Sequence, residues 1–416
     1  MTAERIVIAG GGAAGFFAAI ACAEARPGNQ ILVLERSSQF LSKVRISGGG
    51  RCNVTHTALD SRTFSSRYPR GERTLLAAFH RFSPEETAAW FQTHGVPLKV
   101  EQDGRVFPIT DSSGTVIDCL IGQARSAGVQ LLAGRGLEKA IRHSRGGGFD
   151  LTVADGTNLS CDRLLLATGG ARSSGGPRIA EALGHTIEPP VPSLFSLHVP
   201  APWLQSLPGV SVDEVELTVP GTKLRERGAL LITHHGVSGP AVLRLSAWGA
   251  RALAEMRYRF ALRINWLPTR DEAAVTAELR QRRETQPKRH VATDPIAPMP
   301  GRLWEQLVRS AGISAETIWT TLTRSQLLGL VRQTMHCELP VDGKSLNKDE
   351  FVTCGGVRLQ EVNFKTMESR LVPHLYFAGE LLDIDGITGG FNFQSAWTTG
   401  WIAGHAMADS EPATLA

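Results

Sequence analysis

A glycine-rich turn near the start of the chain constrains its fold more than any other feature. The pattern Gly-x-Gly-x-x-Gly at residues 10–15 follows an apolar run and precedes an alanine-rich stretch that favours a helix. An acidic residue, Glu35, ends a second apolar run twenty residues after Gly15. Strand, turn, helix and acid are the parts of a dinucleotide-binding βαβ unit. The sequence therefore predicts an adenine-dinucleotide site on a Rossmann-like α/β sheet.

The glycines and the acid have separate chemical roles in such a unit. Gly10 permits the tight turn, Gly12 lets the backbone approach a pyrophosphate, and Gly15 lets the helix pack closely on the strand. Glu35 is placed to accept hydrogen bonds from ribose hydroxyls.

The same region has a second interpretation, because residues 6–23 are almost entirely apolar or glycine, as in a secretory signal or a membrane span. However, residues 1–5 carry no net positive charge, and three consecutive glycines weaken a spanning helix. No other stretch approaches the roughly 20 apolar residues that a span requires. We therefore expect a soluble, cytoplasmic protein with no membrane partner.

The cysteines exclude several other classes of site. All six are scattered, and no Cys-x-x-Cys pair is present. This argues against a disulfide scaffold, a zinc site and a dithiol redox motif, and it fits a reducing compartment. The sequence also lacks a His-Glu-x-x-His motif and a convincing Gly-x-Ser-x-Gly elbow, so we expect no bound metal.

The pattern of the chain indicates one nucleotide-binding domain that is interrupted by a long insertion. At 416 residues, two or three domains are expected. Strand-like and helical segments alternate up to a strand at residues 164–166, and the composition changes at residues 189–192. Short strands and then helices are predicted in the insertion, with helical sequence at 311–317 and 325–335. Strands return at 351–353 and 375–378, and a final helix is predicted at 395–408.

A second glycine-rich loop follows the strand at 375–378. Gly379-Glu380 ends this strand, and Asp383, Gly389-Gly390, Asn392 and Gln394 lead into the final helix. Backbone amides at that helix N-terminus can face a pyrophosphate or a flavin ring, and an acid after the strand can bind ribityl or ribose hydroxyls. A plain connecting loop is the alternative. The first glycine motif and the Ala-Thr-Gly strand end at 167–169 favour the nucleotide interpretation.

Three longer segments indicate which dinucleotide binds. Residues 43–53 read Lys-Val-Arg-Ile-Ser-Gly-Gly-Gly-Arg-Cys-Asn and resemble the KxxxSGGGRCN segment of a bacterial family of NAD(P)/FAD-dependent oxidoreductases. Residues 233–243 resemble the family's THxGxSGPAxL segment, and residues 378–394 resemble its AGExLDxDGxTGGxNxQ segment. The chain is thus identified as a member of this group of two-dinucleotide-binding-domain flavoproteins, which bind FAD in an extended form.

The resemblance implies a division into three parts and a set of cofactor contacts. An FAD-binding domain would comprise residues 1–190 and 352–416, an inserted β-barrel-like domain residues 191–268 and 337–351, and a helical subdomain residues 269–336. The implied FAD contacts are Gly10, Gly12, Ala13, Ala14, Gly15, Glu35, Arg36, Lys43, Ser47, Gly48, Gly49, Gly50, Arg51, Cys52, Asn53, Thr168, Gly169, Gly379, Glu380, Asp383, Gly389, Gly390, Asn392 and Gln394. One departure concerns residues 171–177, which form a shorter loop than the family pattern and lack its aspartate.

Candidates for proton transfer are few. The Cys52 thiol lies between Arg51 and Asn53, and nearby cations lower a thiol pKa, so Cys52 is a candidate proton donor. Its alternative role is that of a small residue that packs beneath the flavin ring. The pair His234-His235 has either a proton-transfer or phosphate-contact role, or a structural role in the turn that follows.

Two basic segments suggest a polyanionic partner. Residues 36–82 hold nine basic and two acidic residues, and residues 256–290 hold nine basic and four acidic residues. Such segments attract nucleic-acid phosphates, contact the cofactor's own pyrophosphate, or form solvated faces.

The resemblance implies an enzyme that reduces a carbon–carbon double bond with NAD(P)H as a transient reductant, since no second Gly-x-Gly-x-x-Gly is evident. Uracil in 23S rRNA, which would become dihydrouridine, is the preferred substrate, supported by the basic segments. A small-molecule enone of the bile-acid-intermediate type is the alternative, and a non-catalytic flavin-binding redox sensor is a third possibility.

Overall fold

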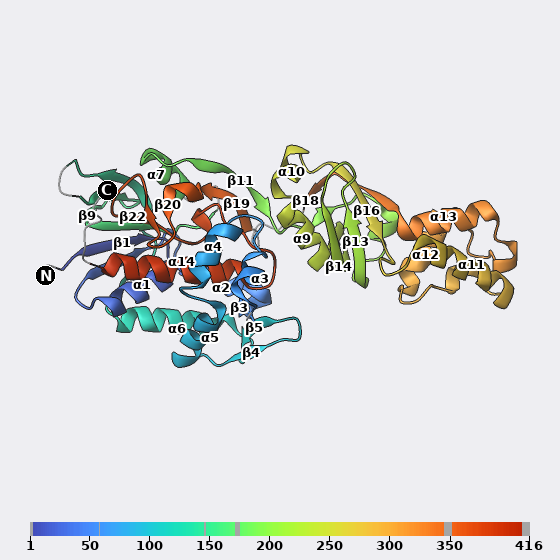
Figure 1. The fold of residues 1–416 in the computed structure, drawn as a ribbon, viewed down its shortest axis with the longest axis horizontal. Coiled ribbons are helices and arrows are strands. Elements are labelled where there is room, and N and C mark those ends of the chain that lie inside the picture. The colour runs from blue at the N-terminus through green and yellow to red at the C-terminus, as the bar shows by residue number, and fades with distance from the viewer. Residues whose placement is uncertain (1–2, 58, 145–146, 171–174, 345–351, 410–416) are drawn as a thin grey trace. The chain divides into compact units, whose positions relative to one another are not determined.

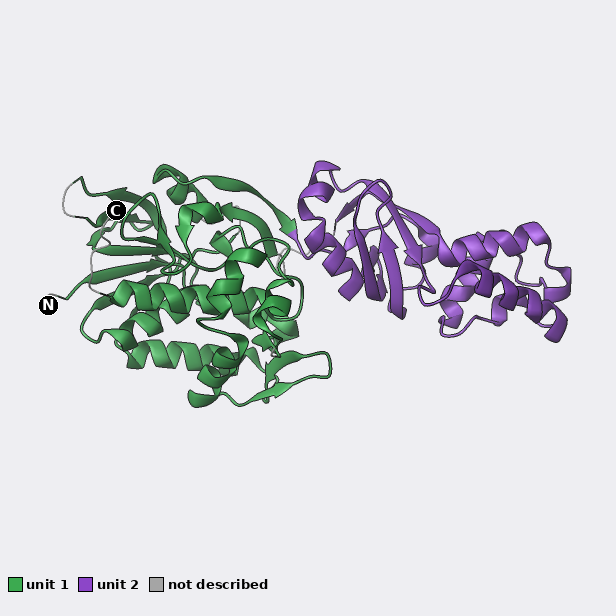
Figure 2. Cartoon of the chain, in the orientation of Figure 1, with its two compact units in different colours: residues 1–192, 348–416 green, residues 193–347 purple. Residues whose placement is uncertain are grey.

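The computed structural model describes residues 3–57, 59–144, 147–170, 175–344 and 352–409. The chain divides into two compact units (Figure 2): unit 1 comprises residues 1–192 and 348–416, and unit 2 comprises residues 193–347. The helices expected at 269–336 belong to unit 2, and their separation as a third domain stays a prediction.

Unit 1 is built on a seven-stranded sheet in the order β20-β21-β22-β10-β1-β2-β6. Figure 1 labels β1, β20 and β22 of this sheet. Strands β22, β10, β1, β2 and β6 run parallel, and β21 and β20 add an antiparallel edge. Its strands are β1 Arg5–Ala9, β2 Gln30–Leu34, β6 Gln130–Leu132, β10 Arg163–Leu166, β20 Val362–Asn363, β21 Glu368–Ser369 and β22 Leu375–Phe377. All four β10 residues and four of the five in β1 are buried, as expected of parallel strands that are covered on both faces. The predicted Rossmann-like α/β fold is confirmed.

The strand order reverses at β1. This strand pairs with β2 on one side and with β10 on the other, and β10 pairs with β22. In register, Ala9 lies opposite Leu166, and Leu166 lies opposite Phe377. The loops that follow these three strands therefore begin at the same edge of the sheet, which is where open α/β sheets bind their ligands.

Helix α1 (Ala13–Ala25) packs against α14 (Phe391–Ala408) at unusually short range. A Cβ atom at Gly400 would lie 2.4 Å from the carbonyl oxygen of Ala14, and one at Gly404 would lie 2.5 Å from that of Ala18. Glycines in α14 and alanines in α1 thus let the two backbones touch. Helix α14 begins four residues before the predicted start at 395.

The remaining elements of unit 1 surround this core. Three small sheets hold β3 Thr55–His56, β4 Leu98–Val100, β5 Arg105–Pro108, β7 Leu137–Arg142, β8 Phe149–Val153, β9 Asn158–Cys161, β11 Ile187–Ser193 and β19 Val352–Val357. The other helices are α2 Ser42–Gly50, α3 Ser61–Ser65, α4 Glu72–Phe79, α5 Pro84–Thr93, α6 Ser113–Ser126 and α7 Gly176–Ala182. Helix α5 begins as its sequence predicts, because Ser83 and Glu86 form a reciprocal capping box.

Unit 2 holds a seven-stranded antiparallel sheet in the order β17-β16-β13-β14-β15-β12-β18. Its strands are β12 Leu197–His198, β13 Ser211–Thr218, β14 Arg225–Thr233, β15 Gly236–Ser238, β16 Phe260–Asn265, β17 Cys337–Val341 and β18 Gly343–Lys344, and its helices are α8 Pro202–Gln205, α9 Pro240–Trp248, α10 Ala250–Glu255, α11 Glu272–Thr285, α12 Gly301–Ser310 and α13 Arg324–Met335. The helix expected at 311–317 is wrong. Helix α12 ends at Ser310, and Gly312 has a φ of +73°, which ends a helix rather than continuing one.

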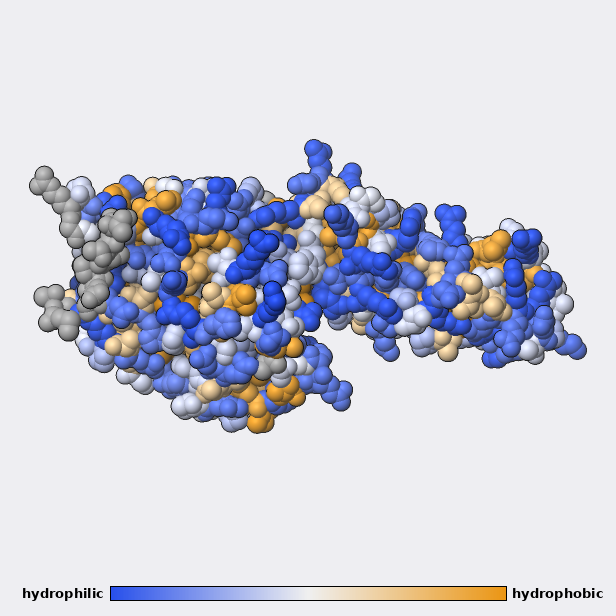
Figure 3. Space-filling view, in the orientation of Figure 1, coloured by the Kyte–Doolittle hydropathy of each residue, from blue (hydrophilic) through white to orange (hydrophobic). Residues whose placement is uncertain are grey.

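The face of the molecule in Figure 3 is largely hydrophilic, with hydrophobic residues in scattered groups. Within the described ranges, no helix combines the length and apolar character needed to cross a membrane. The same ranges hold no group of three or more His, Cys, Asp or Glu side chains arranged to bind a metal ion.

Candidate functional site

The first glycine turn leaves no room for side chains at two of its positions. Gly10 has a φ of +118°, and a Cβ atom there would lie 2.2 Å from the carbonyl oxygen of Ala167. A Cβ at Gly15 would lie 2.0 Å from the carbonyl oxygen of Gly10. The Gly10 contact belongs to the tight turn that the motif predicts, and the Gly15 contact belongs to the close packing of the helix on the strand.

Gly12, by contrast, faces open space. A Cβ atom there would meet no described atom within 4 Å, although Gly12 is the N-cap of α1. No side chain caps this helix, and its first turn, which includes Ala13 and Ala14, holds no acidic residue. The positive end of the helix is therefore open to an anionic group, as a pyrophosphate requires.

Glu35 lies beside this turn at the end of β2. Its Oε2 accepts a hydrogen bond from the Gly11 N–H at 2.9 Å, and its Oε1 accepts bonds from the Ser37 N–H and hydroxyl at 2.8 and 2.9 Å. These bonds fix the carboxylate at the turn, where a ribose would lie. Arg36 is exposed, and its stem lies against Gly136.

Residues 43–53, which resemble the KxxxSGGGRCN segment, form a helix and then a glycine turn. Helical geometry stops after Ile46, because Ser47 is extended and Gly48 and Gly49 are left-handed. A Cβ at Gly49 or Gly50 would meet no described atom within 4 Å, so this turn is open on one side. Arg51 is occupied internally: it stacks on the Phe107 ring at 4.0 Å and pairs with Glu101 at 2.7 Å.

Lys43 and Glu380 bring distant parts of the chain together. The Lys43 ammonium pairs with Glu380 Oε2, and Glu380 Oε1 accepts a hydrogen bond from the Thr353 N–H at 2.8 Å. A Cβ built at Gly169 would lie 4.0 Å from the same Glu380 carboxylate. The loops after β10 and β22 thus meet α2 at one place.

Thr168 carries an unsatisfied group at this meeting point. Its Oγ1 is buried and has no hydrogen-bond partner among the described residues. Buried polar atoms are almost always paired, so this hydroxyl fits a ligand group. With the open space at Gly12 and the fixed Glu35 carboxylate, it shows that the residues present fit a dinucleotide such as FAD.

The second glycine loop is braced by amide side chains. The Asn392 amide accepts a hydrogen bond from the Gly386 N–H at 2.8 Å and donates one to the Gly386 carbonyl at 2.9 Å. The Asn53 amide donates to the Thr55 and Val106 carbonyls and accepts from the Gly390 N–H at 2.9 Å. Asn53 therefore joins the two glycine loops through its side chain, and the cofactor contact that the resemblance implied for it stays a prediction.

Gln394 is engaged within the protein as well. It is 0% exposed, its Oε1 accepts from the Thr55 hydroxyl at 2.6 Å, and its Nε2 donates to the hydroxyls of Thr87 and Thr398. These hydrogen bonds anchor α14, and the FAD contact that the resemblance implied for Gln394 stays a prediction.

The remaining predicted positions near the loop are also packed. Gly379 has a φ of +69°, and a Cβ there would lie 2.8 Å from the Ala14 side chain, so Gly379 lets the end of β22 approach α1. Asp383 is 9% exposed, and its N–H donates to the Val357 carbonyl at 3.1 Å. Gly389 has a φ of +127°.

Sequence reasoning missed a buried ion pair that supports this loop. Arg70 pairs with Asp385 through two nitrogen–oxygen contacts, and Asp385 is 0% exposed. The Tyr68 hydroxyl donates to the Phe391 carbonyl at 2.6 Å, and the Ile387 N–H donates to the Arg67 carbonyl at 3.0 Å. Residues 67–70 thus clamp the loop. The second aspartate of the 378–394 motif was the available signal, but its partner lies 315 residues away.

The expectation that cations lower the Cys52 pKa is wrong. Burial raises the pKa of this thiol to about 12, although a hydrogen bond with Ser47 opposes the shift. Cys52 is 0% exposed. The geometry favours the packing role over proton donation.

We expect the Cys52 thiol to resist alkylation in the native protein. Iodoacetamide reacts with thiolate, and at about pH 8 an ordinary thiol is partly ionised whereas this one stays protonated. Mass spectrometry should find Cys52 unmodified in the holoprotein and fully modified after unfolding in urea. Rapid labelling in the native state would contradict the burial described above.

His234 and His235 are exposed in unit 2. The His235 carbonyl accepts a hydrogen bond from the Val199 N–H at 3.0 Å, and the His198 ring pairs with Asp342 at 2.5 Å beside it. Sequence analysis did not single out His198 or Asp342. Residues 171–174 of the shortened loop lie outside the described residues.

Comparison with known proteins identifies the family. The family described as the HI0933-like protein Rossmann domain matches residues 4–406. The chain belongs to the HI0933-like family. It is 31% identical over 414 residues to the 3-dehydro-bile acid delta(4,6)-reductase of Clostridium scindens, covering 98% of this chain and 99% of that protein. It is also 31% identical over 405 residues to the ribosomal RNA dihydrouridine synthase of Escherichia coli, covering 95% and 96%.

One solved structure is similar to this HI0933-like chain in fold alone. The 3-ketosteroid-delta4-(5alpha)-dehydrogenase of Rhodococcus jostii RHA1 matches at a TM-score of 0.51 and 15% identity, with 98% of this chain and 97% of that chain covered. The family relationship and the fold together place the chain among FAD-dependent oxidoreductases.

Proposed function

We propose that this chain binds FAD along the glycine loops of unit 1 and reduces a carbon–carbon double bond, with uracil in 23S rRNA as the preferred substrate. Both HI0933-like relatives support a reductase, since one is named for a bile-acid reduction and the other for making dihydrouridine. The fit of the loops supports the cofactor.

The residues that would hold FAD follow from their positions. The open N-terminus of α1 at Gly12 would receive the pyrophosphate, Glu35 the adenosine ribose, and Thr168 and the Lys43–Glu380 pair further hydroxyl or phosphate groups. When bound, FAD supplies the hydride, and NAD(P)H is the expected reductant.

The observation that favours RNA is a set of exposed arginines beside the second glycine loop. In the basic segment at residues 36–82, the side chains of Lys43, Arg51 and Arg70 form ion pairs with carboxylates of unit 1. Five exposed arginines of the segment form no ion pair with a described residue, and of these Arg81 donates to the Lys365 carbonyl: Arg45, Arg62, Arg67, Arg73 and Arg81.

Of these arginines, Arg67 belongs to the segment that clamps the loop, since its carbonyl accepts a hydrogen bond from the Ile387 N–H, and Arg45 lies two residues after Lys43 in α2. Exposed guanidinium groups that are free to meet phosphates supply much of the affinity of RNA-binding proteins. An rRNA substrate also implies action in the cytoplasm.

A reoxidation experiment separates the proposal from its alternatives. The holoprotein is reduced with NADPH without oxygen, and then receives either unmodified 23S rRNA or the enone 4-androstene-3,17-dione. We expect RNA to restore the oxidised flavin spectrum, and its rate to fall about tenfold or more between 50 and 200 mM salt.

Two other outcomes would favour one of the alternative functions. Reoxidation by the enone alone, with little dependence on salt, would favour the small-molecule reductase, for which the bile-acid relative is the support. A flavin that neither NADPH nor NADH reduces would favour the non-catalytic sensor.

A further inference from the structure

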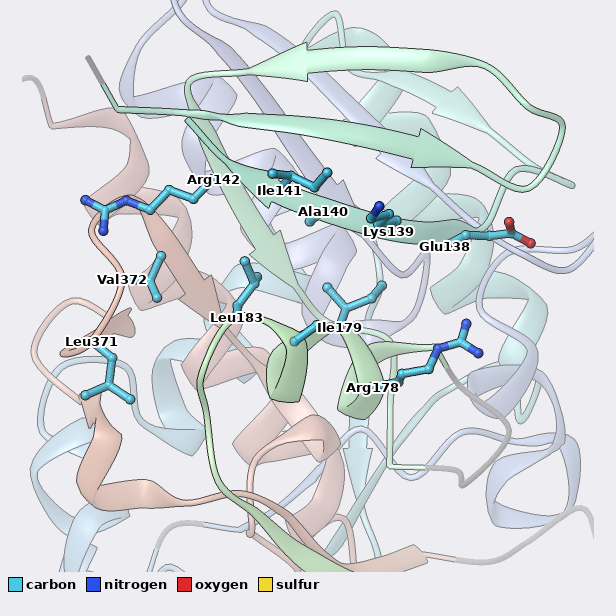
Figure 4. Close-up of a pocket in the computed structure, with 11 residues that line it drawn as sticks. Glu138, Lys139, Ala140, Ile141, Arg142, Arg178, Ile179, Leu183, Leu371 and Val372 are labelled. Atoms are coloured by element: carbon cyan, nitrogen blue, oxygen red, sulfur yellow. The ribbon is translucent and has the colours of Figure 1, made fainter. Parts of the chain in front are cut away.

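A cavity in unit 1 shares no lining residue with the positions assigned to FAD. It lies between β7 and α7, with Leu371 and Val372 at one end (Figure 4), and has a volume of about 630 Å³. This volume is in the range of sites that hold a small organic molecule.

The cavity wall leaves apolar surface exposed. Its apolar lining includes Ala140, Ile141, Ile179, Leu183, Leu371 and Val372. Ile141 and Leu371 are each 49% exposed, although most large apolar side chains of the described residues are buried. Apolar side chains that line a concave surface together with a few polar groups are typical of small-molecule sites.

Cations surround this apolar wall. Lys139, Arg142 and Arg178 line the cavity with a single acid, Glu138, and none of these four forms an ion pair with another described residue. Figure 4 shows Arg142 and Arg178 toward opposite ends of the cavity. Guanidinium groups suit the planar or tetrahedral oxygens of carboxylate, sulfonate and phosphate groups.

We propose that this cavity binds a small amphipathic anion, a free molecule with an apolar chain or ring system and one acidic group. The apolar body would cover Ile179 and Leu371, and the acidic group would pair with Arg142 or Arg178. The net positive charge of the residues that line the cavity disfavours a cationic ligand. The concave shape of the cavity favours one small molecule over a flat lipid surface. The inference stands apart from the proposed reaction, because it requires no residue of the flavin site.

The test uses the FAD-loaded protein and a matched pair of probes, decanoate and decan-1-ol, with binding measured by calorimetry. We expect decanoate to bind at least about tenfold more tightly than the alcohol, a difference of about 1.4 kcal/mol. The double substitution Arg142→Gln and Arg178→Gln should remove this preference. Arg125→Gln, an exposed arginine of α6 outside the cavity, should retain it.

A second pair of variants tests the apolar wall. Leu371→Asp should abolish decanoate binding, whereas Ile109→Asp, at a 57% exposed position outside the cavity, should leave it unchanged. An unchanged flavin spectrum in each variant verifies folding.

The proposal is wrong if decanoate does not bind at millimolar concentration, if the alcohol binds equally, or if the cavity variants behave as wild type. Cavity-dependent sedimentation with phosphatidylglycerol vesicles, without binding of free decanoate, would replace it with a membrane contact.

Discussion

Replacing Gly12 with Glu is expected to weaken FAD binding by at least about 100-fold, or about 2.7 kcal/mol, while the protein still folds. The backbone at Gly12 is extended, with φ −95° and ψ −168°, and its Cβ position meets no described atom within 4 Å. The new carboxylate would occupy the anion site at the start of α1 and repel the pyrophosphate. A negative charge at a helix N-terminus does not itself destabilise the helix.

The matched control is Gly122→Glu, an exposed position in α6 that is equally free of neighbours. Both variants should keep the circular dichroism of the wild type, and flavin titration should distinguish them. Normal FAD affinity in Gly12→Glu would place the pyrophosphate elsewhere.

Replacing Asp385 with Ala is expected to lower the free energy of unfolding of unit 1 by about 3–5 kcal/mol. The change leaves the Arg70 guanidinium, whose side chain is 11% exposed, without its buried carboxylate. It also loosens the clamp on the loop after β22, so FAD should dissociate at a lower urea concentration. Urea unfolding followed by flavin release measures both effects.

Two further variants serve as controls for the effect of Asp385→Ala on stability. Glu305→Ala breaks the exposed pair with Arg309 in α12 and should change stability by no more than about 0.5 kcal/mol. The double substitution Arg70→Met with Asp385→Leu removes both charges and should recover part of the loss. A loss below about 1 kcal/mol in Asp385→Ala would show that the pair does not hold the loop.

The sequence was most informative where local patterns determine structure. The apolar runs of β1 and β10, the Gly10–Gly15 pattern and the Ser83 capping box can each be recognised from residues close together in the chain, although the contact that excludes a side chain at Gly10 is made by the distant Ala167. The fold class and the family were accordingly predictable. The error at 311–317 has the same origin, since helix-forming residues there follow α12, where Gly312 ends the helix.

Features that depend on partners far apart in the chain could not be predicted. Side-chain types alone did not show that Gln394 joins Thr55 and Thr87 in a buried network, or that Asn53 bonds Gly390. Both residues lie in motifs that resemble cofactor-binding segments, yet their amides hold the segments together. The cavity beside β7 and α7 likewise is lined by three segments that lie far apart in the chain, within residues 138–142, 178–183 and 371–372, and it has no sequence motif.

The most direct test of the account is a map of dihydrouridine in the large-subunit rRNA of the source organism after deletion of the gene. We expect one dihydrouridine of 23S rRNA to disappear, the wild-type gene and the Gly122→Glu variant to restore it, and Gly12→Glu not to restore it. An rRNA modification map that is unchanged in the deletion strain would contradict the proposed substrate.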